Sequence, residues 1–299
     1  MLLTRCSSIV LLLLAVACSS DPTAPEASGG AAGTSAGNVG GAGKAGASGS
    51  QSTSCPAGTN PHSELDPLSV GVVSGKLVDE NGEPTTGGLV QVCGTDICRN
   101  ASVGQNGKFV EDVQGPINAP ACKFGDGFDW AKLALPLSAG DSDLGTLITV
   151  RLPDYANGVP LEPGQSVTSG GVTLHLDEAA HVQQNVIDYE TEDERVFRAV
   201  ALPEAALAQL EQDFVQGFAL SPLETRICPS PSISLENSAQ LDPGTELELY
   251  LLGLDAEEEF VPYATWQKVG EGQVSDDGAS LEFPDGVPLL TAIGVRVKP

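Results

Sequence analysis

Short runs in which apolar and polar residues alternate fill most of the chain after about residue 67, and this pattern predicts strands. Gly, Pro, Asn and Asp separate the runs, as they separate the strands of antiparallel sheets. In the first half the predicted strands are 70–78, 89–93, 97–103, 108–113, 130–135 and 144–152. Many short strands with little helical periodicity are typical of a β-sandwich, so we predict an all-β fold.

The second half continues this pattern and adds one helix. Residues 172–176 and 245–251 alternate, with leucines on one face and polar side chains on the other. Residues 203–214 predict a short helix, because Pro203 suits the first helical turn and one apolar stripe follows it. That stripe consists of Leu207, Leu210 and Phe214. The sequence therefore predicts a second β-rich, sandwich-like part with a single helix.

Asn106-Gly107 lies between the predicted strands 97–103 and 108–113. This dipeptide favours the two-residue type I′ turn, in which both central residues have positive φ. We therefore expect a β-hairpin at this point.

The hydropathy pattern changes at the N-terminus. Arg5 precedes an apolar run, 9–16, that is too short to span a membrane, and Ala17-Cys18 follows it. This arrangement resembles a bacterial lipoprotein signal, which implies a signal peptide over 1–17 and a lipid on Cys18. Ser19-Ser20, in place of a retaining Asp, favours the outer membrane or cell surface. Because Ala15 departs from the commoner Leu of such signals, plain secretion is the alternative.

Residues 18–66 are nearly all small or polar, and Gly, Ala and Ser dominate. Such a segment has too little apolar surface to offset the entropy of ordering it. We predict a disordered tether with a root-mean-square reach on the order of 40 Å. G-x-G-x-x-G at 41–46 and G-x-S-x-G at 33–37 match binding and catalytic motifs, but the expected tether provides neither the strand nor the helix that those motifs need.

A family resemblance covers about residues 69–152, within a predicted domain over 67–153. The segments 75–84, 87–92 and 104–109 have the Gly and apolar spacing of the carboxypeptidase regulatory-like domain, and 143–147 resembles its closing strand. The resemblance implies a transthyretin-like β-sandwich without catalytic residues. Relatives of this domain are often described as carbohydrate-binding-like, which labels an architecture and is weak support for sugar binding.

The remaining residues, 154–299, form the predicted second domain. Their closing part, from 263–269 through 274–278 to 294–296, resembles the C-terminal modules of Gly-tethered bacterial lipoproteins. This resemblance implies a β-rich module with no known activity.

The net charge of −26 bears on the partners. A polyanion would be repelled by this surface, and no cluster of Lys and Arg is available for phosphate contacts, so nucleic acid is excluded. The acidic surface is best explained by solubility in the cell envelope.

Few residues suggest chemistry. His175 and His181 would lie about 20 Å apart on one strand, too far to share a metal, and are better explained as exposed strand residues. The acidic segment 255–259 lacks the ligand spacing of a calcium loop. We therefore predict no catalytic residue, no metal and no cofactor. Large aromatic side chains offer a sugar-stacking platform, with burial in the core as the alternative. The candidates are Trp130, Trp266 and Tyr263.

Five of the seven cysteines lie beyond the signal and the lipidation site, so an odd number remains for an oxidising compartment. Cys93 and Cys98 flank a four-residue loop between predicted strands, and we expect a disulfide between them. The pairing of Cys55, Cys122 and Cys228 stays open at this point.

These observations favour a non-catalytic, lipid-anchored envelope protein that presents β-sandwich surface for binding or for a structural role. Its expected partners are the membrane, through the anchor, and a glycan or an envelope protein. The alternative is an envelope hydrolase whose site is not recognisable in the sequence.

Overall fold

The computed structural model describes residues 55, 67–85, 88–254 and 260–299. The predicted signal peptide, Cys18, the tether apart from Cys55, and the acidic segment 255–259 lie outside the described residues. By its internal contacts the chain divides into two units, 1–50 and 51–299. All described residues belong to the second unit.

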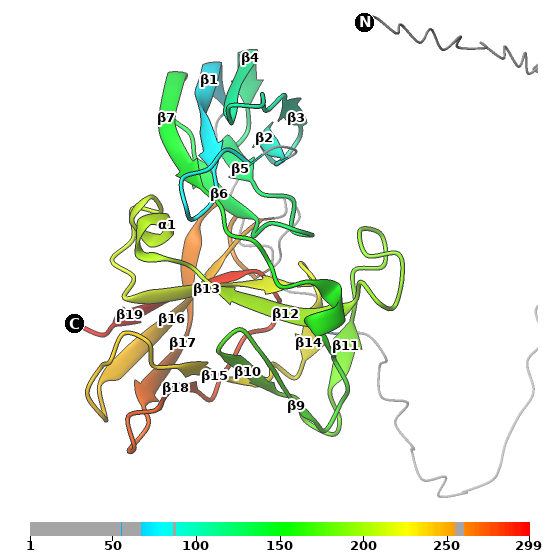
Figure 1. Ribbon diagram of the computed structural model, residues 1–299, viewed down its shortest axis with the longest axis vertical. Coiled ribbons are helices and arrows are strands. Elements are labelled where there is room, and N and C mark those ends of the chain that lie inside the picture. Colours follow the sequence, from blue (N-terminus) through cyan, green and yellow to red (C-terminus); the bar gives the residue numbers. More distant parts are fainter. Residues whose placement is uncertain (1–54, 56–66, 86–87, 255–259) are drawn as a thin grey trace, which may run out of the picture. The chain divides into compact units, whose positions relative to one another are not determined.

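The described residues form strands with one short α-helix and one 3₁₀ turn, which confirms the all-β prediction (Figure 1). In the first half the strands are β1 (Leu68–Val78), β2 (Val90–Cys93), β3 (Cys98–Ala101), β4 (Lys108–Ile117), β5 (Ala121–Phe124), β6 (Leu133–Pro136) and β7 (Gly140–Ile148). In the second half they are β8 (Val159–Pro160), β9 (Ser166–Ser169), β10 (Val172–His175), β11 (His181–Gln183), β12 (Val196–Ala201), β13 (Gln216–Ser221), β14 (Arg226–Cys228), β15 (Ser232–Glu236), β16 (Glu246–Leu252), β17 (Trp266–Val274), β18 (Ser280–Phe283) and β19 (Ala292–Val297). The helices are η1 (Tyr155–Asn157) and α1 (Glu204–Ala208).

The first half contains two sheets, in the strand orders β4-β1-β7 and β3-β2-β5-β6. Strand β1 pairs antiparallel with β4 and parallel with β7. Val73 and Leu77, an even number of residues apart, are buried on one face of β1, as alternation predicts. Val70 is also buried, at an odd spacing from them, and the β1–β4 register shifts between Val70 and Val72. The segment that resembles a closing strand, 143–147, lies in β7 beside β1.

The hairpin predicted at Asn106-Gly107 is wrong. Gly107 has a φ of 77°, but Asn106 is not among the residues with positive φ, and the Gly107 N–H donates to the Gly104 carbonyl at 2.8 Å. The strands on either side belong to different sheets, since β3 pairs with β2 and β4 pairs with β1. A Cβ at Gly107 would lie 2.4 Å from the Leu77 carbonyl oxygen, so glycine is needed here for a close approach to β1.

The second half contains a 10-stranded sheet in the order β8-β12-β13-β19-β16-β17-β18-β15-β10-β9, and β11 and β14 pair separately. Helix α1 is shorter than the predicted 203–214, because the chain turns at Glu211, whose φ is 52°. The predicted stripe of Leu207, Leu210 and Phe214 is nevertheless buried. Burial of this stripe therefore does not require a continuous helix.

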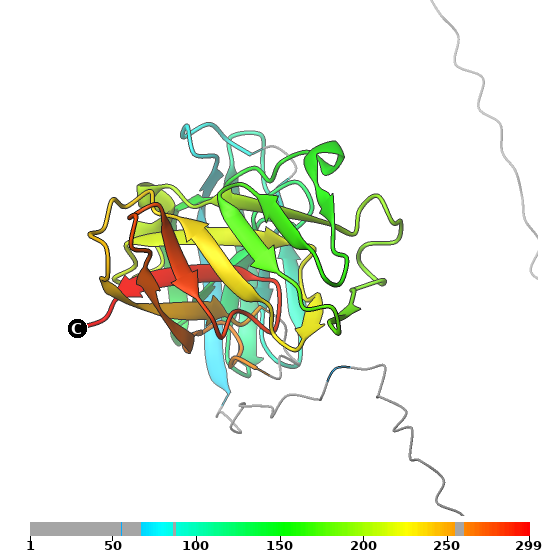
Figure 2. The same cartoon turned by 90° about the horizontal axis from the view of Figure 1, so that it is seen from below.

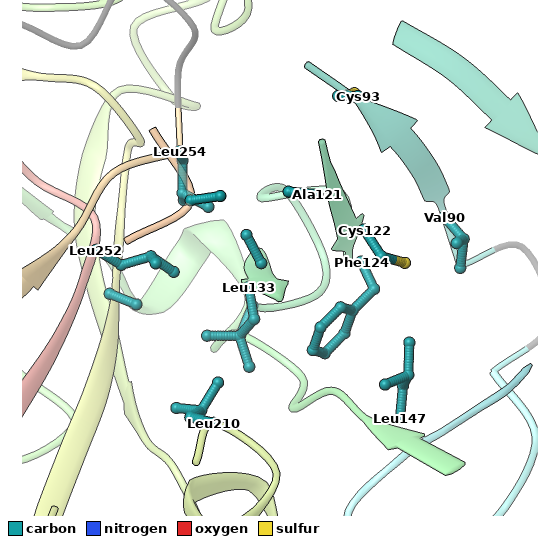
Figure 3. Packing of buried hydrophobic residues seen from close by; sticks show 14 of the residues in the cluster. Val90, Cys93, Ala121, Cys122, Phe124, Leu133, Leu147, Leu210, Leu252 and Leu254 are labelled. Atoms are coloured by element: carbon teal, nitrogen blue, oxygen red, sulfur yellow. The ribbon is translucent and has the colours of Figure 1, made fainter. Parts of the chain in front are cut away.

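One hydrophobic cluster contains residues from both halves. Figure 3 shows Leu133 of the first half near Leu210 and Leu252 of the second, and Leu147 beside Phe124 in the same cluster. A second cluster lies entirely within residues 161–295. The predicted boundary between 153 and 154 separates the sheets, since no sheet contains strands from both sides, but it does not divide the first cluster.

A side-chain amide joins the halves at the edge of β7. Gln209 Oε1 accepts from the Ile148 N–H at 2.7 Å, and Gln209 Nε2 donates to the Ile148 carbonyl at 2.7 Å. The amide thereby satisfies one residue's backbone donor and acceptor, as a neighbouring strand would. This contact holds the segment after α1 against β7.

Candidate functional site

Trp266, one of the aromatic residues predicted for sugar stacking, lines a cleft between the two halves. The cleft has a volume of about 380 Å³. Its walls come from β6 and β7 on one side, and from the segment after α1 and the start of β17 on the other. The lining residues are Ala134, Leu135, Pro136, Leu144, Gln209, Leu210, Glu211, Gln212, Ala264, Thr265 and Trp266. The cleft thus combines a partly buried indole with apolar side chains, carboxamides and a carboxylate.

Phe214 supports the indole of Trp266. The two rings lie 4.8 Å apart between centroids with an interplanar angle of 69°, an edge-to-face arrangement. Phe214 also packs against Tyr250 at 5.5 Å. A Cβ at Gly294 on β19 would lie 2.5 Å from the Phe214 ring, so this position must be glycine to leave space for the ring. Packing therefore holds the indole in place at the cleft.

A polar network lies beside these rings. Arg296 donates to the Tyr250 hydroxyl at 3.2 Å and to Gln212 Oε1 at 3.4 Å. The Tyr250 hydroxyl donates to Glu248 at 2.9 Å. The hydrogen bond from Lys268 is the main cause that lowers the pKa of Glu248, with a further contribution from Tyr250. The network orients Gln212, which is one of the polar residues of the cleft.

The three candidate aromatic residues do not form one platform. Tyr263 is 3% exposed and its ring packs under the Lys123 ammonium, which lies 4.8 Å from the ring centroid. A buried ring cannot stack on a ligand, so the stacking role is corrected for Tyr263. Trp130 is partly buried, bridges to Arg151, and is not among the cleft residues. Trp266 alone remains a stacking candidate in the cleft.

The five cysteines in the described part of the chain form two disulfides and leave one thiol free. One joins Cys93 and Cys98, which are register partners in the β2–β3 pair. The other joins Cys55 to Cys228 on β14, a choice that the sequence had left open. Cys122 is free and buried, and burial raises the pKa of its thiol to about 12. The Cys122 thiol therefore stays protonated and unreactive.

His175 lines a second depression, on the outer face of β10, β15, β17 and β18, with a volume of about 550 Å³. We call it the sheet groove. The imidazole Nδ1 lies 2.8 Å from Ser166 Oγ, and Nε2 lies 3.0 Å from Ser234 Oγ. Sequence reasoning missed these serines. The β9–β10 hairpin places Ser166 opposite His175, and recognising the alternation of both strands would have revealed that pair.

The Ser–His distances match those between a nucleophile and its base, but the backbone beside Ser234 is engaged in sheet pairing. Strand β15, which carries Ser234, pairs on both sides, with β10 and with β18. The ladders therefore engage the backbone N–H groups beside Ser234, and none is left there to stabilise an oxyanion. His181 lies on β11 in another sheet.

Within the described ranges, no group of three or more His, Cys, Asp or Glu side chains is arranged to hold a metal ion. No helix in the described part of the chain is long and apolar enough to cross a membrane.

The fold and the cleft define an all-β protein with an aromatic-lined cleft between its two halves. No protein-family model matches the chain. No curated protein matches it either. A solved structure of a DUF3823 family protein from Bacteroides ovatus is similar at 8% identity with a TM-score of 0.18, covering 74% of this chain and 96% of that one. This likeness is too low to carry an argument.

Proposed function

We propose that this protein is a lipid-anchored protein of the cell envelope that binds glycans in the Trp266 cleft and performs no catalysis. The lipoprotein-like signal with Cys18 and the Gly-rich segment after it support the anchor and the tether. The regulatory-like resemblance of 67–153 supports a binding module. The observation that carries the glycan proposal is the indole of Trp266, fixed by Phe214 at the cleft.

The cleft has the chemistry of a saccharide site. Its volume of about 380 Å³ falls within the range of about 300 to 1,000 Å³ that small-molecule sites occupy. The apolar face of a sugar ring packs on an aromatic side chain, and its hydroxyls need donors and acceptors close by. Gln212, Glu211 and Thr265 supply those polar groups.

Replacing Trp266 by alanine is expected to weaken glycan binding about tenfold, roughly 1.4 kcal/mol, because the stacking surface is lost. A glycan array probed with the full-length protein identifies the ligand, and titration calorimetry measures the loss. Trp130→Ala is the matched control, since Trp130 lies outside the cleft, and it should bind as the original protein does. Equal binding by Trp266→Ala and the original protein would contradict the proposal.

Replacing Cys18 by alanine is expected to abolish incorporation of labelled palmitate and to release the protein from membranes. The reason is that the thiol of this residue is the attachment point that the signal resemblance implies. Fractionation and autoradiography measure both effects, and Cys6→Ala, which alters a cysteine inside the predicted signal, is the control. Labelling that survives in Cys18→Ala rules out this anchor.

An envelope hydrolase is the second candidate, favoured by the contacts of His175 with Ser166 and Ser234. Under our proposal, the protein turns over none of a broad panel of ester, amide and glycoside substrates. Turnover that disappears in Ser234→Ala would favour the hydrolase instead.

A further inference from the structure

The outer face of the large sheet presents a polar row that crosses five strands, and the part of the row from Ser234 to Gln273 lies in the sheet groove. In register, Thr168 on β9 lies opposite Thr173 on β10, which lies opposite Ser234 on β15. Ser234 lies opposite Glu282 on β18, and Glu282 lies opposite Gln273 on β17. Directly opposed side chains share one face of a sheet, so these five side chains form a continuous line. Figure 2 views these strands from below.

The alternation of the same strands directs the side chains of this row toward solvent. The neighbours of the row residues along each strand are buried in the second hydrophobic cluster, and they include Val172, Leu174, Ile233, Leu235, Leu281 and Phe283. Turning this row inward would bring the buried neighbours to the solvent side and expose the core. The polar line is therefore a rigid, preorganised surface.

Adjacent strands lie about 4.8 Å apart, so the groove from β10 across β15 and β18 to β17 measures about 14 Å. His175 lies at one end, beside the row, and Gln273 lies at the other. Imidazole, hydroxyl, carboxylate and carboxamide groups all hydrogen-bond to hydroxyls. This length and chemistry suit a short, extended oligosaccharide rather than a compact cofactor.

Charge selects the kind of sugar. The groove is lined by the acidic residues Glu271 and Glu282 and by no Lys or Arg. Glu271 is already neutralised by Lys268 at 2.6 Å and by Lys298 at 3.1 Å. Among the described residues no Lys or Arg forms an ion pair with Glu282, whose carboxylate accepts only a long contact of 3.4 Å from the Ser280 hydroxyl. An exposed carboxylate in the middle of a hydroxyl-binding row favours a cationic group on the ligand and repels an acidic one.

We propose that the sheet groove is a second binding site, which takes an oligosaccharide carrying primary amines. An ammonium group of the ligand pairs with Glu282, and its hydroxyls bond to Ser232, Ser234 and Gln273. The ring nitrogens of His175 contact Ser166 and Ser234, so the imidazole holds Ser234 in place for the ligand. Ser166, through its contact with Nδ1, holds the imidazole in position. The site is separate from the Trp266 cleft, with which it shares no lining residue. A test of this site is therefore independent of a test of the proposed function.

The test compares a glucosamine tetramer with an N-acetylglucosamine tetramer, because the two differ in charge but share the sugar backbone. Titration calorimetry on the full-length protein is expected to show at least tenfold tighter binding of the glucosamine tetramer. The preference should shrink as salt is raised, since the ion pair at Glu282 is exposed to solvent. Equal affinity for the two tetramers, or no binding of the glucosamine tetramer, overturns the proposal.

The variants separate a specific ion pair from general attraction to an acidic protein. Glu282→Gln is expected to weaken binding of the glucosamine tetramer about tenfold and to leave the N-acetylated tetramer unaffected. Glu80→Gln removes the same charge from an exposed turn in the first half and should change nothing. An equal loss in the two variants would mean attraction by net charge alone and would overturn the site. Trp266→Ala should leave this binding intact, whereas it weakens binding at the cleft.

Discussion

Replacing Arg198 by alanine is expected to lower the free energy of unfolding by about 3 kcal/mol or more, which is a large fraction of a typical protein's stability. Arg198 is 1% exposed and joins the two halves. Its guanidinium donates to the Phe128 carbonyl at 2.9 Å and the Pro153 carbonyl at 3.1 Å, both in the first half. It also donates to the Ser221 hydroxyl at 3.0 Å, in the second half. The substitution removes this donor from all three acceptors, of which Ser221 is fully buried.

The Tyr155 ring adds to the cost, because it lies 3.7 Å from the guanidinium carbon and loses a cation–π contact. Tyr189 lies in the same region, and its hydroxyl donates to the Gly127 carbonyl at 2.9 Å. Burial is the main cause that raises the pKa of Tyr189 to about 12, so this hydroxyl keeps its proton and continues to donate. The groups that contact the Arg198 guanidinium are therefore neutral. A lysine at this position has no planar fork of donors, so it cannot form the same set of hydrogen bonds.

Urea denaturation followed by circular dichroism measures the effect, and the melting temperature should fall by about 6 °C or more. Arg198→Lys should recover only part of the loss. Arg151→Ala, which removes an exposed arginine at the end of the first half, is the control and should lie within about 0.5 kcal/mol of the original protein. If Arg198→Ala is no less stable than Arg151→Ala, the contacts of Arg198 do not hold the two halves together.

Removing the disulfide between Cys55 and Cys228 is expected to have the second large effect. The paired cysteines are 173 residues apart, so the bond closes a long loop in the unfolded chain. In the chain-entropy account such a loop contributes roughly 5 kcal/mol, because the bond removes much of the freedom of the unfolded state. The double variant Cys55→Ala/Cys228→Ala should therefore unfold at a much lower urea concentration.

The second disulfide is the internal control for this prediction. Cys93 and Cys98 are only 5 residues apart, and a loop of this size contributes roughly 2 kcal/mol. Cys93→Ala/Cys98→Ala should therefore lose about 3 kcal/mol less than the long-loop variant. Equal losses for the two double variants would show that loop closure is not the source of the stability.

The connection of Cys55 also changes the expected tether. Cys55 lies inside the segment 18–66, which composition alone assigned to a free linker. Because the bond attaches this residue to β14, the stretch between Cys18 and the attachment point is shorter than predicted. Composition records only the apolar content of a segment, so it could not reveal a covalent partner so far along the chain.

The candidate sites show the same limit. The alternation of strands 172–175 and 232–236 shows that His175 and Ser234 point away from the core. It does not show that the two residues are neighbours, because neither segment alone indicates that β10 pairs with β15. Trp266 and Tyr263 are three residues apart and looked equivalent as stacking residues. Their difference arises from neighbours distant in sequence: Lys123 covers Tyr263, whereas Phe214 supports Trp266 at an open cleft.

Alternation along the chain is enough to predict the fold class and the inward face of the strands that alternate regularly. Both follow from alternation within a few residues, as in Glu246–Leu252, where Leu247, Leu249 and Leu251 are fully buried. Local alternation does not show which strands pair, as the failed hairpin at Asn106-Gly107 demonstrates. Nor does it show which side chains form the cleft and the sheet groove, and both became clear only in the folded structure. Strand pairing joins residues far apart in the chain, and the packing of the whole core selects one arrangement among many that the local pattern permits.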